Sequence, residues 1–174
     1  HGRWKVDLER ATAERYARAC HQPIREVFVA AEGAAGVLER VRQAGYAIGL
    51  VSNTFMLSKA LDEDLEAAGM LDYFACRVYS ADVGVMKPHR RIFETALNGL
   101  GVSAAETMFV GDLIDVDVKG AKRLGMTTVL KIADGYVPAG RYRPDHIIRR
   151  ITELPDLLPR CRARNRRTAD SGRD

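Results

Sequence analysis

The sequence has few cysteines and no long apolar run, and each absence removes a class of protein. Cys20, Cys76 and Cys161 are its three cysteines; they lie far apart and lack Cys-x-x-Cys spacing. An odd number of scattered thiols indicates neither a disulfide framework nor a zinc site, so we expect reduced thiols. No stretch reaches the roughly 20 apolar residues of a membrane span. We also find no basic-then-apolar leader, and therefore expect a soluble, cytoplasmic protein that does not bind membranes.

The chain also has little net charge outside its last residues. Residues 160–174 contain six arginines and two aspartates, which account for the whole net charge of +4. This segment lacks aromatic residues and apolar periodicity, so we predict a basic, disordered tail. Nucleic acid is not expected as a partner. The alternative, contact of the tail with RNA or an acidic protein, would show as salt-dependent binding.

What the sequence does contain is a regular alternation of helical and strand patterns. An apolar content of 47% is enough for one buried core. An amphipathic helix is expected over residues 6–19, and a short apolar run over 27–31 leads into the core. The following elements are expected as helices over 36–44, 56–68, 89–100 and 117–124, and as strands over 46–51, 74–79, 107–110, 127–132 and 146–148. This alternation predicts a doubly wound α/β fold with a parallel sheet flanked by helices.

Polar side chains follow three of the predicted strands. Ser52 ends the first of these strands, Lys87 follows the turn after the second, and Asp112 directly follows the third. Ligands of a doubly wound sheet bind at the carboxyl ends of its strands. A hydroxyl, an isolated lysine and a carboxylate pair, here Asp112 with Asp117, are the groups that phosphoryl transfer needs.

Each of these residues also has a plainer interpretation. Ser52, with Asn53 after it, could simply cap a helix, although a capped helix start also suits phosphate. Lys87 could be a solvated lysine, but its apolar, glycine-bearing approach over residues 83–86 is unlike that of most surface lysines.

The acidic cluster after the third of these strands allows two roles as well. Asp112, Asp115 and Asp117 fall within six residues, and such like charges favour a divalent cation. Hard oxygen ligands suit magnesium. The alternative is that Asp115 or Asp117 caps the following helix.

The order of these motifs over residues 29–158 resembles that of the haloacid dehalogenase-like (HAD) hydrolase superfamily, most closely its capped phosphatases. The resemblance implies a Rossmann-like core and hydrolysis of a small phosphorylated metabolite through an aspartyl-phosphate. It implies Ser52 and Lys87 as catalytic residues, Ser52, Asn53 and Lys87 as phosphate ligands, and Asp112 and Asp117 as ligands of a Mg²⁺ cofactor. The Gly111-Asp112 pair favours a phosphatase over a dehalogenase.

One motif of that superfamily is not found. Its nucleophile is the first aspartate of an Asp-x-Asp pair that ends an N-terminal strand. The nearest acid pair here, Asp7 and Glu9, opens an amphipathic stretch instead. In the superfamily that strand lies between the strands ending at Ser52 and before Asp112. We therefore expect a sheet that lacks its usual first strand and a chain that is inactive alone.

Three explanations remain open at this point. The chain could be the C-terminal part of a phosphatase whose beginning holds the nucleophile and most of the cap. It could be a non-catalytic relative that binds a phosphorylated ligand or a partner. It could also be half of a split enzyme completed by an N-terminal segment from another polypeptide. The expected domains are a cap remnant over 1–24, a core over 25–159 and the tail over 160–174.

Overall fold

The computed structural model describes residues 29–134 and 141–158, together with six single residues between positions 12 and 23. The tail, the Asp7–Glu9 pair, Cys20 and Cys161 lie outside the described residues, as does most of the helix expected over 6–19, so the proposed domain boundaries stay predictions. Within the described ranges, no helix combines the length and apolar character that crossing a membrane requires.

The strands form two separate parallel sheets. In the first, β1 (Gly49–Ser52) pairs with β2 (Cys76–Tyr79), with Leu50 opposite Arg77. In the second, the order is β3 (Met108–Gly111), β4 (Thr127–Lys131) and β5 (His146–Ile148). All five predicted strands are confirmed, with ends that differ from the predicted ones by at most three residues.

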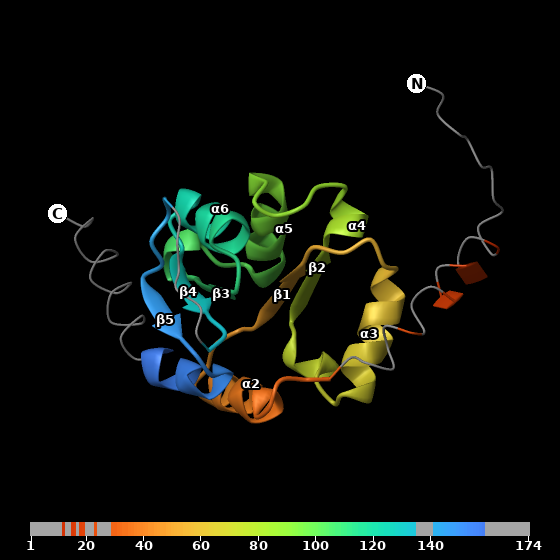
Figure 1. Cartoon of the computed structure of the whole chain (residues 1–174), viewed down its shortest axis with the longest axis horizontal. Coiled ribbons are helices and arrows are strands. Elements are labelled where there is room, and N and C mark those ends of the chain that lie inside the picture. The colour runs from red at the N-terminus through yellow and green to blue at the C-terminus, as the bar shows by residue number, and fades with distance from the viewer. Residues whose placement is uncertain are drawn as a thin grey trace, which may run out of the picture.

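Helices cover both faces of these strands. The full helices are α2 (Ala34–Gln43), α3 (Ser58–Ala67), α4 (Ser80–Val83), α5 (Arg90–Leu100) and α6 (Lys119–Arg123). The shorter elements are the 3-10 helices η1 (Leu71–Tyr73), η2 (Ala104–Glu106) and η4 (Ile151–Leu157) and the π-helical turn η3 (Ile114–Val118). Figure 1 shows α5 and α6 above the strands and α2 below them. This arrangement confirms a doubly wound, Rossmann-like fold.

Two apolar clusters explain the layers. The upper cluster joins β2, α5 and α6 through Val78, Ile92, Phe93, Ala96, Leu97, Ala121 and Met126. The lower cluster joins α2, β4, β5 and η4 through Val37, Val41, Val129, Ile148, Leu154 and Leu158. The buried stripe of α5 contains the four residues that its helical spacing predicts.

Three local expectations were wrong or incomplete. The turn expected at residues 80–82 is the short helix α4. The helix expected from Asp117 is preceded by η3, which begins at Ile114 and buries Asp117. Of the apolar run 27–31, the described part is not a strand, and Val29 is 84% exposed. The described residues of this run are therefore not part of the sheet.

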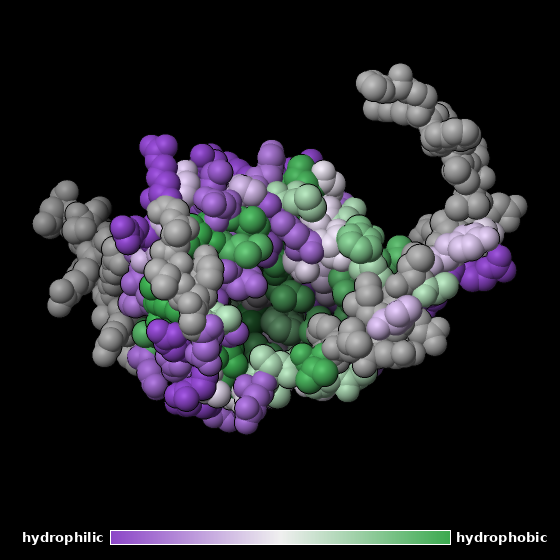
Figure 2. Space-filling view, viewed as in Figure 1, coloured by the Kyte–Doolittle hydropathy of each residue, from purple (hydrophilic) through white to green (hydrophobic). Residues whose placement is uncertain are grey.

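β1 and β3 each have one edge with which no described strand pairs. The sequence of β1 predicted burial on both faces, yet its residues are half-buried or exposed, and all of β3 is half-buried. β4, which is paired on both sides, has four fully buried residues. Figure 2 shows a hollow with apolar side chains in the middle of the molecule, where Figure 1 places β1 and β3. The expected gap in the sheet is thus present among the described residues.

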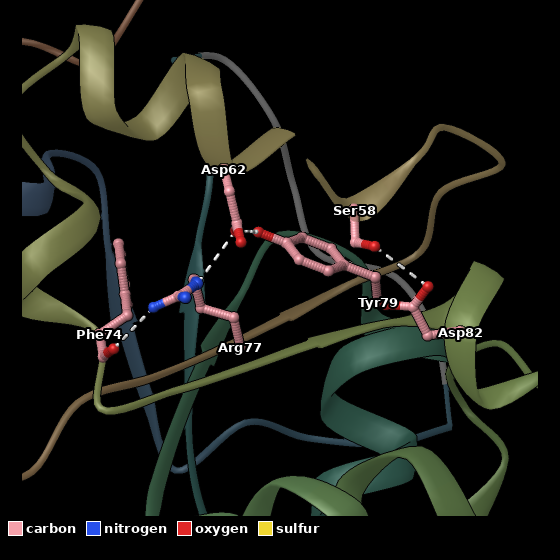
Figure 3. A network of polar contacts seen from close by, with 6 residues as sticks. All are labelled: Ser58, Asp62, Phe74, Arg77, Tyr79 and Asp82. Carbon is pink, nitrogen blue, oxygen red and sulfur yellow. Dashed lines mark hydrogen bonds and ion pairs between the residues drawn. The ribbon is translucent and has the colours of Figure 1, made fainter. Parts of the chain in front are cut away.

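The outer strand β2 is fixed to α3 by polar contacts (Figure 3). The hydroxyl of Tyr79 and the Nε of Arg77 donate to the same oxygen of Asp62, at 2.6 and 3.0 Å. At the start of α3, Ser58 donates to Asp82 of α4 at 3.2 Å. Because α3 follows the loop that leaves Ser52, these contacts hold the far end of that loop.

Candidate functional site

The predicted polar residues gather at the carboxyl ends of the strands. β1 ends at Ser52, and Asp112 follows the last residue of β3. Lys87 lies in the loop between α4 and α5, and its peptide bond to Pro88 is cis. The three segments are joined by a continuous series of polar contacts that runs from Asn53 through Lys87 to Asp117.

The first link in this series is the contact between Lys87 and Asp117. The ammonium lies 2.8 Å from Oδ1 of the carboxylate, and the two side chains are 13% and 2% exposed. This ion pair is the contact that the structure gives to Oδ1 among the described residues. The ammonium also lies 5.7 Å from the centre of the Phe109 ring. Lys87 therefore points into the site and not to open solvent.

The other oxygen of Asp117 organises the turn after β3. Oδ2 accepts the backbone N–H groups of Asp112 and Leu113, each at 3.1 Å. Gly111 makes this approach possible, because a Cβ at that position would lie 2.4 Å from the Cβ of Asp117. The turn therefore wraps around the Asp117 carboxylate.

Asp112 differs from Asp117 because its side chain is exposed, as is that of Asp115. No group of three His, Cys, Asp or Glu side chains that could hold a metal ion occurs among the described residues. Mg²⁺ needs fewer protein ligands, because it keeps several waters and binds one or two carboxylates together with a substrate phosphate. Asp112 as the direct ligand, with Asp117 beside it, fits that requirement.

The side chain of Asn53, which was predicted to bind phosphate, contacts the neighbouring Lys87 loop. Its amide nitrogen donates to the backbone oxygen of Lys87 at 3.1 Å, and its amide oxygen accepts the backbone N–H of Lys87 at 2.7 Å. The side chain thus contacts the Lys87 backbone. Its neighbour Ser52 is half-buried at the end of β1, and the N–H of Thr54 is already accepted by the Ser80 hydroxyl.

Sequence reasoning missed Ser80. Its buried hydroxyl accepts the N–H of Thr54 and donates to the carbonyl of Thr54, both at 2.8 Å. Thr54 in turn accepts the N–H of Met56 at 2.9 Å. The signal was available in the sequence, because Ser80 directly follows a predicted strand, as Ser52 does.

Large apolar side chains border the site. Phe55, Met86 and Leu113 are 88%, 61% and 53% exposed, and each lies within three residues of Ser52, Lys87 or Asp112. Exposed apolar side chains thus lie close in the sequence to each of the three predicted site residues.

Comparison with known proteins adds a family to this geometry. Residues 3–131 match the model of a family described as haloacid dehalogenase-like hydrolase. The glyceraldehyde 3-phosphate phosphatase of Methanopyrus kandleri is 33% identical over 131 residues, which cover 70% of this chain and 53% of that protein. The pyrimidine 5'-nucleotidase YjjG of Escherichia coli is 30% identical over 161 residues, which cover 91% of this chain and 70% of that protein.

Among solved structures, a HAD phosphatase from Thermococcus onnurineus superimposes with a TM-score of 0.70 and 31% identity. The match covers 88% of this chain and 66% of that one. The chain spans about half the length of the curated glyceraldehyde 3-phosphate phosphatases that it matches.

Proposed function

The chain belongs to the haloacid dehalogenase-like hydrolase family, and we propose that it carries the phosphate- and metal-binding part of a magnesium-dependent phosphatase for a small phosphomonoester. The observation that supports this most is the Lys87 ammonium held against the turn of Asp112 and Asp117, beside the loop of Ser52. Several of its relatives are named as phosphatases, which agrees with this chemistry.

Each residue at the site has a role that its position supports. The Ser52 hydroxyl, at the end of β1, binds a phosphoryl oxygen. Lys87 is a point charge that neutralises the phosphoryl group and the attacking carboxylate together. Asp112 would hold the magnesium ion, and Asp117 orients the turn that carries Asp112. Bound there, the ion would offset the negative charge that develops on the phosphoryl group.

The nucleophile belongs, on this proposal, to a strand that fills the gap between β1 and β3. Such a strand would pair with both open edges and bury the half-exposed residues of β1 and β3. If it is parallel to them, its carboxyl end lies between Ser52 and Asp112. An aspartate there would attack phosphorus as the bond to the leaving alcohol breaks, and water would then hydrolyse the aspartyl-phosphate to inorganic phosphate. The chain by itself is then expected not to turn over by this route.

A second candidate is a protein that binds a phosphorylated ligand without hydrolysing it. It is favoured by one observation: Asp117, the buried carboxylate of the site, is already engaged by Lys87 and by two backbone N–H groups. It therefore has no oxygen directed at a substrate. Phosphate binding without turnover would support this candidate.

The test is phosphatase activity toward an aryl phosphate with magnesium, for this chain and for one extended upstream to include an apolar strand ending in Asp-x-Asp. The proposal expects activity only in the extended chain, or when that segment is added as a peptide. Asp112→Ala or chelation of magnesium should abolish it, and Asp156→Asn on η4 is the matched control. Turnover by the unextended chain that depends on Asp112 would show that the nucleophile is already present.

A further inference from the structure

We propose that Asn53 is a positioning residue that acts through Lys87 and that its amide does not bind the phosphate. This role rests on the proposed function. In it, Lys87 contacts the phosphate, and Asn53 holds Lys87 in place.

The geometry is a two-point contact between one side chain and one backbone unit. The amide oxygen accepts the N–H of Lys87 at 2.7 Å, and the amide nitrogen donates to the carbonyl of Lys87 at 3.1 Å. The two bonds require one acceptor and one donor at fixed spacing, which only an amide side chain of this length provides. They also fix which end of the Asn53 amide is oxygen.

The contact joins the segments that follow β1 and β2, beyond the end of their backbone pairing. Pairing of β1 with β2 ends at Ser52 opposite Tyr79. Beyond that point, Ser80 binds both backbone groups of Thr54, and Asn53 binds both backbone groups of Lys87. These side chains therefore continue the association after the backbone ladder has stopped.

Lys87 is consequently fixed at both ends. Its backbone is held by Asn53, and its ammonium is held by Asp117 at 2.8 Å. A lysine side chain has four flexible carbons, and placing its ammonium at a phosphate costs conformational entropy. Fixing the lysine backbone lowers that cost and therefore strengthens phosphate binding. Asn53 fixes that backbone from the position next to Ser52, and so sets the hydroxyl and the ammonium relative to each other.

A double-mutant cycle tests whether Asn53 acts through Lys87. Binding of inorganic phosphate in the presence of magnesium is measured by calorimetry for the chain, Asn53→Ala, Lys87→Ala and the double variant. We expect Asn53→Ala to weaken binding about tenfold and Lys87→Ala to weaken it more. The double variant should bind no more weakly than Lys87→Ala. If Asn53→Ala costs the same factor in both backgrounds, Asn53 contacts phosphate directly and the proposal is wrong.

A second measurement does not depend on phosphate. Hydrogen exchange of the Lys87 amide should be about five- to tenfold faster in Asn53→Ala, because one hydrogen bond is lost. Asn53→Asp keeps the acceptor and should keep the protection. Asn98→Ala, near the far end of α5, is the matched control. Unchanged exchange in Asn53→Ala would overturn the contact whatever phosphate does. If the chain or Lys87→Ala shows no phosphate effect, the proposed function fails and the exchange result still decides the role of Asn53.

Discussion

The ammonium of Lys87 lies 2.8 Å from Oδ1 of Asp117, whose side chain is only 2% exposed. A buried carboxylate that loses its cationic partner is left with an uncompensated charge. We therefore expect Lys87→Met to lower the free energy of unfolding by about 3 kcal/mol. Adding Asp117→Asn should restore most of this loss, because the charge is removed while an oxygen remains for the N–H groups of Asp112 and Leu113. Urea unfolding of the two variants measures both effects.

The control for this pair is Lys59→Met on α3, outside the site loops, which should change stability by less than about 0.5 kcal/mol. If Lys87→Met is as mild as Lys59→Met, the ion pair does not compensate the buried charge. If the double variant is as unstable as Lys87→Met, the loss comes from the other contact of the ammonium, with the Phe109 ring.

Gly111 should tolerate no side chain, since an added Cβ would meet the Cβ and the carboxylate of Asp117 at 2.4 to 2.6 Å. Gly111→Ala is expected to lower stability by about 1–3 kcal/mol through overpacking. It should also reduce magnesium-dependent phosphate binding, because the turn around Asp117 must open. Chemical denaturation and calorimetry check the two effects.

Gly36→Ala is the matched control for this substitution. A Cβ at Gly36 in α2 meets nothing within 4 Å, so the change should raise stability by up to about 1 kcal/mol through helix propensity. Equal losses in the two alanine variants would mean that the contact with Asp117 is not what makes Gly111 necessary.

The sequence predicted the strand ends well because strand patterns are local. The apolar runs before Ser52 and Asp112 are continuous, and a polar residue at the end of such a run marks the edge of the sheet where ligands bind. The position of these residues at one edge could therefore be predicted before any coordinates.

The partners of these residues could not be predicted in the same way. The contact of Asn53 with Lys87 spans 34 residues, and that of Ser80 with Thr54 spans 26. Whether an amide meets a phosphate or a backbone depends on how two loops pack, which no local pattern contains. The burial of Asp117 likewise follows from the π-helical turn at Ile114, which shares its acidic, apolar sequence with an ordinary helix start.

The Tyr79 hydroxyl is expected to make the folding stability fall at alkaline pH. Burial and the hydrogen bond to Asp62 raise the pKa of the Tyr79 hydroxyl well above its ordinary value of 10. The unfolded chain ionises first, so stability is complete below about pH 10 and falls as the pH rises above it. Tyr79→Phe should remove that part of the decline, measured as the unfolding midpoint in urea between pH 8 and 11.

The neighbouring contact of Arg77 provides the comparison (Figure 3). Arg77→Met also loses a contact with Asp62 but leaves the Tyr79 hydroxyl in place, so its stability should still fall above pH 10. An alkaline decline of Tyr79→Phe as steep as that of the unchanged chain would show that other groups cause it.

The Asp145 carboxylate is expected to make the folding stability fall at acidic pH. Burial raises the pKa of its carboxyl. The N–H and hydroxyl of Thr128 and the ammonium of Lys122 lower this pKa by a larger amount, so it lies below the ordinary value of 3.8. The contacts are 2.9, 2.8 and 3.2 Å long. They attach the segment before β5 to β4. Because the folded-state pKa is depressed, this stabilisation is present above about pH 4 and is lost as the pH falls below it.

Asp145→Asn should therefore flatten the loss of stability between pH 5 and 3. Glu106 separates this effect from acid sensitivity in general. Its pKa is also lowered, by Ser103, but the group is fully exposed and solvent screens it, so Glu106→Gln should change the slope little. Unfolding midpoints across that range for both variants decide the matter. A slope that Glu106→Gln flattens and Asp145→Asn does not would place the acid-sensitive contact at η2 and not at the junction of β4 and β5.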